Sequence, residues 1–202
     1  MRFIGARSLG FVAVVAATLM GVGCTAGTTY GPGGEPGPYT GPPPETAVWF
    51  AGDSLAHHTA RHMPHEPFWL TATGASGFVD HAALFNGRIR DNVINAGVET
   101  HLPDVVIAMG GVNDLSVGTT AAAIITAMDE FDAELASLGV PVRWVLEPTW
   151  GHAVNYQPIY DHLIATYPDV IDCRGQAGDS FDGLHPLDYQ WFAYCVDDSV
   201  HP

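Results

Sequence analysis

The sequence predicts an α/β protein built on a doubly wound parallel sheet. Short apolar runs rich in Val, Ile and aromatic residues alternate with segments whose apolar residues recur at helical spacing. The runs are almost continuously hydrophobic, which is typical of strands buried on both faces of a parallel sheet. At 202 residues, of which 47% are hydrophobic, the chain is also long enough to form one domain with a sizeable core.

The N-terminal segment is typical of an export signal. Basic residues precede an apolar stretch shorter than the roughly 20 residues of a spanning helix, and small residues follow just ahead of Cys24. Residues 1–23 are therefore predicted to be a signal peptide. The small residues suggest a bacterial lipoprotein in which Cys24 is lipidated; an ordinary signal is the alternative. The protein is expected at the cell surface or in the periplasm, or secreted if Cys24 carries no lipid.

A linker is expected between this signal and the folded domain. Residues 24–46 are rich in glycine and proline, and they lack an apolar period that a core could bury. The folded domain is therefore predicted to span residues 47–202.

Five apolar runs in this domain are predicted to form the sheet. The first, AVWFA, and the third, DVVIAMG, read as buried strands, and the second, PFWLTA, is a weaker pattern. In a parallel sheet of this kind, functional residues gather at the carboxyl ends of the strands. The five runs occupy residues 47–51, 67–72, 104–110, 142–148 and 169–173.

The clearest helix is expected between the third and fourth strands. Thr119 or Thr120 can cap its first turn, and Gly139 can end it. Its apolar residues recur at spacings of three and four, at Ile124, Met128, Phe131, Leu135 and Leu138. Two further helices are predicted, over residues 156–167 and after Pro186.

Acidic side chains far outnumber basic ones. The chain has 22 Asp and Glu against 7 basic residues, all of them arginine, for a net charge of −15. So acidic a surface disfavours nucleic acid or an anionic bilayer as a partner, and it suits neutral or cationic substrates. Contact with a membrane is expected only through lipid on Cys24.

The three cysteines are an odd set for an exported protein. If Cys24 is used for lipidation, Cys173 and Cys195 remain as one pair that an oxidising compartment would allow to join. Two buried free thiols are the alternative.

Candidate catalytic groups follow successive predicted strands. Ser54 comes after the first strand, at a strand-to-helix turn where its hydroxyl would face the crevice. After the second strand, Gly74 and Gly77 would let a backbone N–H approach a ligand closely. After the third strand, Asn113 offers a side-chain amide as a hydrogen-bond donor. These groups are expected to meet at one edge of the sheet.

Asp182 and His185 follow the fifth predicted strand and are three residues apart. A carboxylate at that spacing can hold the Nδ1–H of the imidazole and leave Nε2 free to take a serine proton. The tetrapeptide AGDS occurs twice, ending at Ser54 and at Ser180. Only the first copy follows a buried strand, so Ser54 is the expected nucleophile and Ser180 a turn residue near the site.

The motifs together resemble the SGNH hydrolase (GDSL esterase/lipase) superfamily. The resemblance covers residues 47 to about 197, and its second block is the loosest. The four matching stretches are GDSL at 52–55, GASG at 74–77, GVND at 111–114 and DGLHP at 182–186.

This resemblance implies a flavodoxin-like, three-layer α/β/α sandwich and an esterase that needs no metal or other cofactor. Ser54 would be the nucleophile, His185 the general base and Asp182 its orienting partner. The oxyanion donors would be the backbone N–H groups of Ser54 and Gly77, with Gly74 as a substitute for Gly77, and the Asn113 side chain. The expected substrate is a small-molecule or glycan ester with a short acyl group, for example acetyl on carbohydrate.

Three alternatives to this hydrolase remain open on sequence alone. The chain could be an acyltransferase that modifies cell-envelope glycans, or a lysophospholipase or lipase. It could also be a non-catalytic, envelope-binding lipoprotein, although Ser54, Asn113, Asp182 and His185 are all in place. A monomer is expected.

Histidines are concentrated after the predicted nucleophile. His58 and His62 are four residues apart and could share a metal on a helix, but Glu66 is the one nearby candidate for a further ligand. We therefore expect no metal site and interpret His57, His58, His62 and His65 as solvated or rim-lining residues. Trp150 could form a pocket wall or belong to the core or surface.

Overall fold

A computed structural model describes residues 47–65, 67, 69–79, 87–149, 154–180 and 182–201. The predicted signal peptide, the linker with Cys24, and the side chains of Glu66 and Trp150 lie outside the described residues. Within the described ranges, no helix combines the length and the apolar character needed to cross a membrane.

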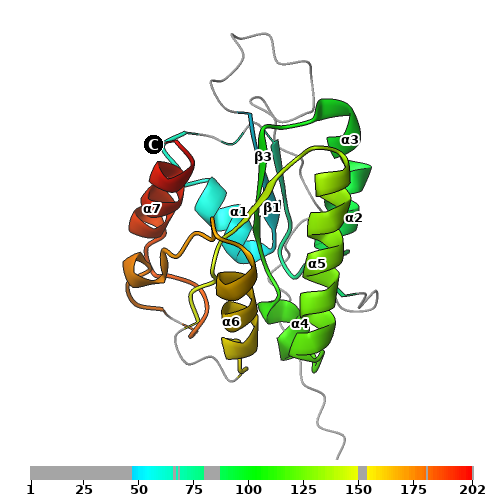
Figure 1. Cartoon of the computed structure of the whole chain (residues 1–202). Helices are drawn as coiled ribbons and strands as arrows, with labels where there is room; N and C mark the ends of the chain where they lie inside the picture. The colour runs from blue at the N-terminus through cyan, green and yellow to red at the C-terminus, as the bar shows by residue number, and fades with distance from the viewer. Residues whose placement is uncertain are drawn as a thin grey trace, which may run out of the picture.

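The described strands form one parallel sheet in the order β2-β1-β3-β4 (Figure 1). The predicted α/β class is therefore confirmed. The two central strands, β1 and β3, are buried along their whole length, as their continuous hydrophobicity predicts. The strands are β1 (Val48–Gly52), β2 (Trp69–Ala72), β3 (Val105–Met109) and β4 (Val142–Trp144).

The fifth strand expected at residues 169–173 is not confirmed. Ile171 forms only an isolated parallel bridge with Val145, just past the end of β4. Its N–H donates to the Trp144 carbonyl at 2.7 Å, and its carbonyl accepts from Leu146 N at 3.0 Å. The chain turns into a 3-10 helix at Arg174, so it leaves the sheet before a ladder can form.

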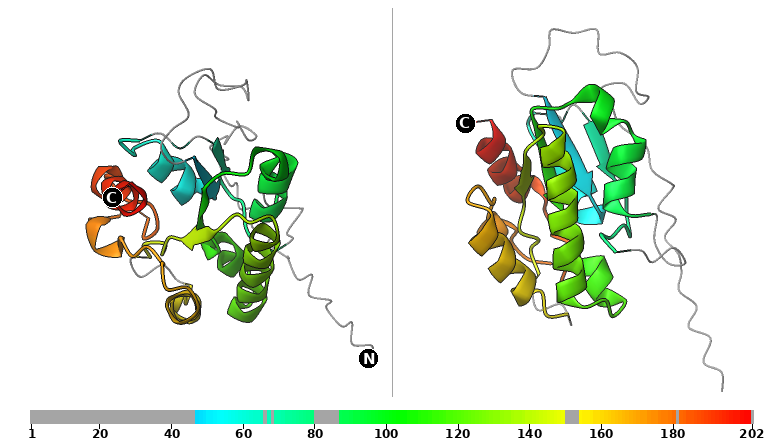
Figure 2. Two further views of the ribbon diagram at one scale, coloured as in Figure 1. Left: turned by 45° about the horizontal axis from the view of Figure 1, so that its top comes forward. Right: turned by 45° about the vertical axis from the view of Figure 1, so that its right-hand side comes forward.

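Helices lie on both sides of the sheet (Figures 1 and 2). Helices α1 and α7 pack together on one side, and α2, α3 and α5 lie on the other, with α6 beside α5. The helices are α1 (Ser54–Ala60), α2 (Ile89–Asn95), α3 (Val98–His101), α4 (Val112–Ser116), α5 (Ala121–Ser137), α6 (Gln157–Thr166) and α7 (Gln190–Val200).

The longest of these, α5, confirms the predicted cap and apolar face. The Thr120 hydroxyl accepts a hydrogen bond from Ala123 N at 3.3 Å. Gly139 follows the last turn with φ +77°, a conformation that favours glycine. Four of the five predicted apolar residues are fully buried, and Leu138 is partly buried.

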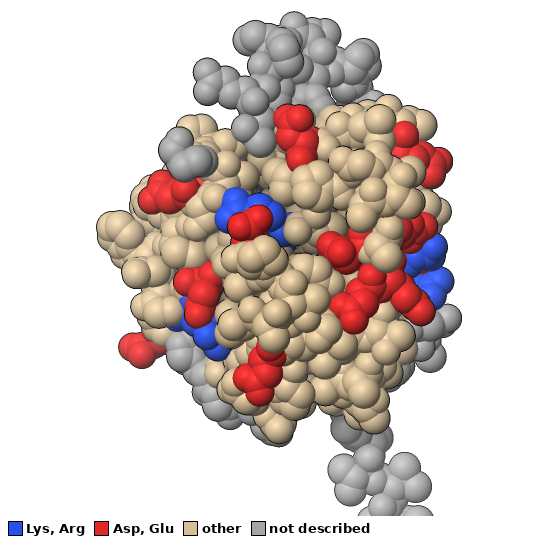
Figure 3. Space-filling model, in the orientation of Figure 1, with Lys and Arg blue, Asp and Glu red and all other residues tan. Residues whose placement is uncertain are grey.

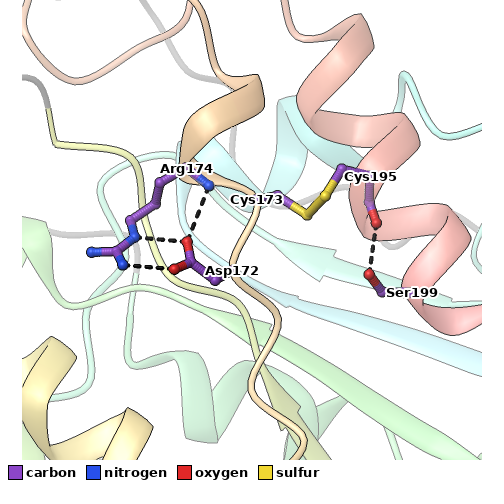
Figure 4. The surroundings of a disulfide bond; sticks show 5 residues. All are labelled: Asp172, Cys173, Arg174, Cys195 and Ser199. Atoms are coloured by element: carbon purple, nitrogen blue, oxygen red, sulfur yellow. Dashed lines mark hydrogen bonds and ion pairs between the residues drawn. A yellow bond between two sulfur atoms is a disulfide. The ribbon is translucent and has the colours of Figure 1, made fainter.

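A disulfide between Cys173 and Cys195 confirms the predicted pairing (Figure 4). It joins the segment that follows the Ile171 bridge to the middle of α7. The catalytic candidates Asp182 and His185 lie within the 22-residue span that it closes.

Replacing both cysteines with serine is expected to lower the free energy of unfolding by about 3 kcal/mol, because a closed loop of this size restricts the unfolded chain by roughly that amount. Urea unfolding of the wild type and the double variant under oxidising conditions measures the difference. Adding a reductant should bring the wild type to the midpoint of the variant. Equal midpoints under oxidising conditions would show that the bond does not constrain the unfolded chain.

Candidate active site

Ser54 is positioned by a tight turn between β1 and α1. Gly52 has φ +155°, and a Cβ at this position would lie 2.1 Å from the Met109 carbonyl oxygen, so only glycine fits. Asp53 caps α1 by accepting a hydrogen bond from Leu55 N at 2.9 Å. Ser54 is thus the first residue of the helix, where its backbone N–H has no acceptor within the helix.

The Ser54 hydroxyl, His185 and Asp182 form a continuous chain of hydrogen bonds. Ser54 Oγ lies 2.9 Å from His185 Nε2, although the two residues are 131 positions apart in sequence. On the other side of the ring, His185 Nδ1 lies 2.6 Å from Asp182 Oδ2. With the proton on Nδ1, the imidazole donates to Asp182 and accepts from Ser54. The fold therefore brings together the three residues that the sequence singled out.

The loop that carries Asp182 and His185 is held by its own hydrogen bonds. Asp182 Oδ1 accepts from Leu184 N at 2.9 Å and from His185 N at 2.7 Å. Burial alone would raise the pKa of Asp182, but these bonds and the His185 side chain outweigh it and lower the pKa to about 2. Asp182 therefore stays ionised at neutral pH. Ser180 Oγ donates to the His185 carbonyl at 2.8 Å and to Asp182 Oδ1 at 3.3 Å, so its hydroxyl helps to hold this loop.

Asn113 lies beside the serine turn, but its amide already has partners. Its Nδ2 donates to the Ser76 carbonyl at 2.9 Å and to Asp53 Oδ2 at 3.2 Å. These contacts connect the loop after β2 to the turn that carries Ser54. A ligand that takes an amide hydrogen from Asn113 would have to replace one of these acceptors, and the longer bond to Asp53 is the weaker.

The loop after β2 is fixed by a buried carboxylate. Asp114 accepts from Phe78 N at 2.8 Å and from Val79 N at 3.0 Å. A Cβ on Gly77 would lie 2.5 Å from Asp114 Oδ2, so the backbone approaches this side chain as closely as only glycine allows. Gly77 is thereby held beside the first turn of α4, which carries Asn113. Gly74, the substitute candidate, lies in the turn that precedes this loop.

Two buried carboxyl groups that the sequence did not single out lie next to residues of this site. Asp53 and Glu147 are both completely buried, and each carboxyl group shifts the pKa of the other. Glu147 Oε2 accepts from Val112 N at 3.2 Å, while Oε1 meets no N–H or hydroxyl donor among the described residues. Burial raises the pKa of Asp53 to about 6 and that of Glu147 well above its usual value. The pair is satisfied when one carboxyl is protonated and donates to the other.

Glu147→Gln is expected to flatten the dependence of stability on pH. In the wild type, both raised pKa values stabilise the fold below the ordinary values of 3.8 and 4.5, and this stability is lost as pH rises through the folded values. One shared proton corresponds to about 1.4 kcal/mol per pH unit. Glutamine keeps the donor but cannot ionise, so the variant should lose less stability between pH 5 and pH 8.

Urea unfolding at several pH values measures this difference. The exposed variant Glu130→Gln is the matched control and should follow the wild type. Parallel pH curves for Glu147→Gln and the wild type would contradict a proton shared by the buried pair.

The histidines after Ser54 have separate local partners. His57 Nδ1 lies 3.2 Å from the Ala72 carbonyl, and the rings of His58 and His62 both pack on Tyr189. Burial lowers the pKa of both His57 and His58, so neutral rings are favoured there. The spacing of His58 and His62 is therefore explained by packing on an aromatic ring.

A scan of the sequence against protein-family models finds no match, and a search of curated proteins finds none with significant similarity. The class of the protein is therefore defined by its fold and site alone. It is an α/β protein with a hydrogen-bonded Ser–His–Asp chain at the carboxyl edge of a parallel sheet.

Proposed function

We propose that the protein is a serine hydrolase that cleaves carboxylic esters through an acyl-enzyme, as an SGNH-type esterase. The observation that carries the proposal is the order of hydrogen bonds from Ser54 to His185 to Asp182, at 2.9 and 2.6 Å. This order is the one in which a nucleophile, a general base and an orienting carboxylate act together.

In the proposed reaction, His185 Nε2 takes the Ser54 proton as Oγ attacks the ester carbonyl carbon. The carbonyl π electrons move to the oxygen, and Asp182 stabilises the imidazolium that forms. As the tetrahedral intermediate collapses, His185 donates the proton to the departing alkoxide, and the acyl group remains on Ser54. Water then attacks the acyl-enzyme with His185 again as the base, and the carboxylic acid leaves.

The oxyanion would be held by the backbone N–H groups of Ser54 and Gly77 and by the Asn113 amide. The first of these is favoured because a helix offers its first N–H groups no internal acceptor. For Asn113, the oxyanion would replace Asp53 Oδ2, the more distant of its two acceptors. The oxyanion would replace Asp53 as the acceptor only during the acyl-transfer step, because negative charge develops on the carbonyl oxygen only in that step.

Asn113→Ala is expected to lower kcat by about 100–1000-fold, the usual cost of losing one oxyanion donor. Initial rates with an aryl acetate measure the loss, and thermal unfolding separates it from misfolding. Asn95→Ala, at the exposed end of α2, is the control and should retain wild-type turnover. A fall of less than about fivefold in kcat for Asn113→Ala would remove this residue from the proposed oxyanion hole.

We propose short acyl esters of hydroxyl-rich alcohols, such as acetylated carbohydrate, as the substrate class. The acidic surface supports a neutral or cationic substrate over an anionic one, because red acidic groups outnumber blue basic ones over the face drawn in Figure 3.

A series of aryl esters from acetyl to palmitoyl tests the substrate class. The proposal expects the highest kcat/KM for acetyl or another short chain. Activity that rises with chain length would favour a lysophospholipase or lipase. Acyl release measured with water alone and with added sugar acceptors distinguishes hydrolysis from acyl transfer, and no turnover of any ester would favour a non-catalytic role.

The strand order also supports a more specific description of the fold. The order β2-β1-β3-β4 matches the first four strands of the flavodoxin-like order 2-1-3-4-5. The parallel bridge between Val145 and Ile171 lies where a fifth strand would pair. We therefore propose a flavodoxin-like, three-layer sandwich whose last strand is reduced to this bridge.

A further inference from the structure

A second group of functional side chains lies away from the proposed catalytic site. It comprises His65, in the connection from α1 to β2, and Asp197 and His201, at the end of α7. One ligand atom from each of the three lies within 4.8 Å of those from the other two. In a parallel sheet, a connection that leads into a strand lies at the amino edge, whereas Ser54 follows the carboxyl end of β1. The two groups therefore belong to different edges of the sheet.

Asp197 is the buried centre of this group. Its side chain is only 2% exposed, against 65% for that of His65. Asp197 Oδ2 lies 2.7 Å from His65 Nδ1, and Oδ1 accepts from His65 N at 3.2 Å. A buried carboxylate needs a cation or several donors, and both of these contacts come from a single residue of another segment.

His201 brings a second imidazole to the same carboxylate. It lies four residues after Asp197, and its N–H donates to the Asp197 carbonyl at 2.8 Å. Its ring centroid is 4.8 Å from that of His65. Arg143, on β4, donates to the backbone carbonyls of Ser199 and Asp169. The group therefore presents two imidazoles and one carboxylate, with no guanidinium bonded to the carboxylate among the described residues.

We propose that His65, Asp197 and His201 bind a divalent transition-metal ion, with zinc the best fit. Two imidazole nitrogens and one carboxylate oxygen form a usual zinc ligand set, and water completes the tetrahedron. Binding replaces the hydrogen bond between His65 and Asp197 and requires both imidazoles to be neutral. The ion would tie the connection after α1 to the end of α7 and so stabilise the folded chain. The site uses neither His58 nor His62, and it is independent of the proposed esterase activity.

Zinc titration of the untagged chain, freed of metal with a chelator, tests this proposal. Calorimetry should give one saturable zinc ion per chain, and the midpoint of thermal unfolding should rise with zinc concentration. His201→Ala should weaken zinc binding by at least about tenfold, because even the loss of a residue outside the ligand set costs 10–100-fold. His65→Ala should do the same, which gives a second variant if the first is poorly folded.

His62→Ala is the matched control, because His62 is exposed on the same connection but outside the group. It should bind zinc as the wild type does, and ester hydrolysis should be the same with and without zinc. The proposal is wrong if the wild type shows no saturable binding, if His65→Ala and His201→Ala retain full affinity, or if His62→Ala loses it.

Discussion

Ser54→Ala is expected to abolish ester hydrolysis, with kcat falling by about 10⁴–10⁶-fold. The hydroxyl that lies 2.9 Å from His185 Nε2 is the atom that forms the acyl-enzyme, and alanine leaves the base nothing to activate. Residual activity would come only from water attacking a bound ester. Burst and steady-state kinetics with an activated aryl acetate measure both the acyl-enzyme step and turnover.

The second AGDS copy supplies the control for this experiment. Ser180 Oγ donates to the His185 carbonyl and to Asp182 Oδ1 and accepts from Asp182 N, so Ser180→Ala loosens this loop but leaves the Ser54 hydroxyl and the imidazole in place. Its turnover should fall by far less than that of Ser54→Ala, since each such bond contributes about 1 kcal/mol. If Ser54→Ala kept wild-type turnover, or if only Ser180→Ala lost all activity, the assignment of Ser54 as the nucleophile would be wrong.

Asp182→Asn is expected to lower kcat by about 10⁴-fold with little change in structure. The carboxylate accepts from His185 Nδ1 on one oxygen and from two backbone N–H groups on the other. Asparagine has only one acceptor oxygen. If that oxygen serves the loop backbone, its NH2 group faces the imidazole, and if it serves the imidazole, the NH2 group faces the loop. Facing the imidazole, it donates to Nδ1 and places the ring proton on Nε2, where it cannot accept from Ser54.

The matched control for this change is Asp179→Asn, an exposed carboxylate in the same loop. It should retain wild-type kcat and the same midpoint of thermal unfolding. If Asp182→Asn lost less than about tenfold in kcat, the imidazole would be oriented by some group other than Asp182.

Much of the fold could be predicted because its core elements have strong local patterns. The buried strands β1 and β3 are continuous apolar runs, and α5 combines a threonine cap, an apolar face and a final glycine. The short helices α2, α3 and α4 were not predicted. Each is at most seven residues long, so neither periodicity nor propensity marks it, and it depends on contacts made after folding.

The fifth strand illustrates a different limit of sequence reasoning. The run DVIDC has the composition of a strand, but pairing depends on where its neighbour ends. Strand β4 ends at Trp144, and the disulfide at Cys173 connects the segment after Ile171 to α7. Only Val145 and Ile171 remain opposite each other, so a composition typical of a strand yields a single bridge.

The positions of Ser54, Gly77 and Asn113 could be predicted because each follows a strand, and parallel strands bring such ends together. Asp182 and His185 follow only the Ile171 bridge, and their spacing in the sequence marked them instead. The groups that hold these site residues in place could not be predicted from the sequence. Glu147 ends an apolar run and carries no motif, and its meeting with Asp53 is a product of tertiary packing. The two acceptors of the Asn113 amide, Ser76 O and Asp53, are likewise fixed only when three loops converge.

Covalent labelling with a fluorophosphonate is the most direct test of the central claim, that Ser54 is a nucleophile activated by His185. The reagent forms a stable phosphonyl ester with an activated serine, and peptide mass spectrometry locates it. The expected result is one adduct per chain on Ser54, with loss of esterase activity in proportion to labelling and no adduct in His185→Ala. An adduct on Ser180 or another residue, or an unlabelled wild type, would contradict the proposed mechanism.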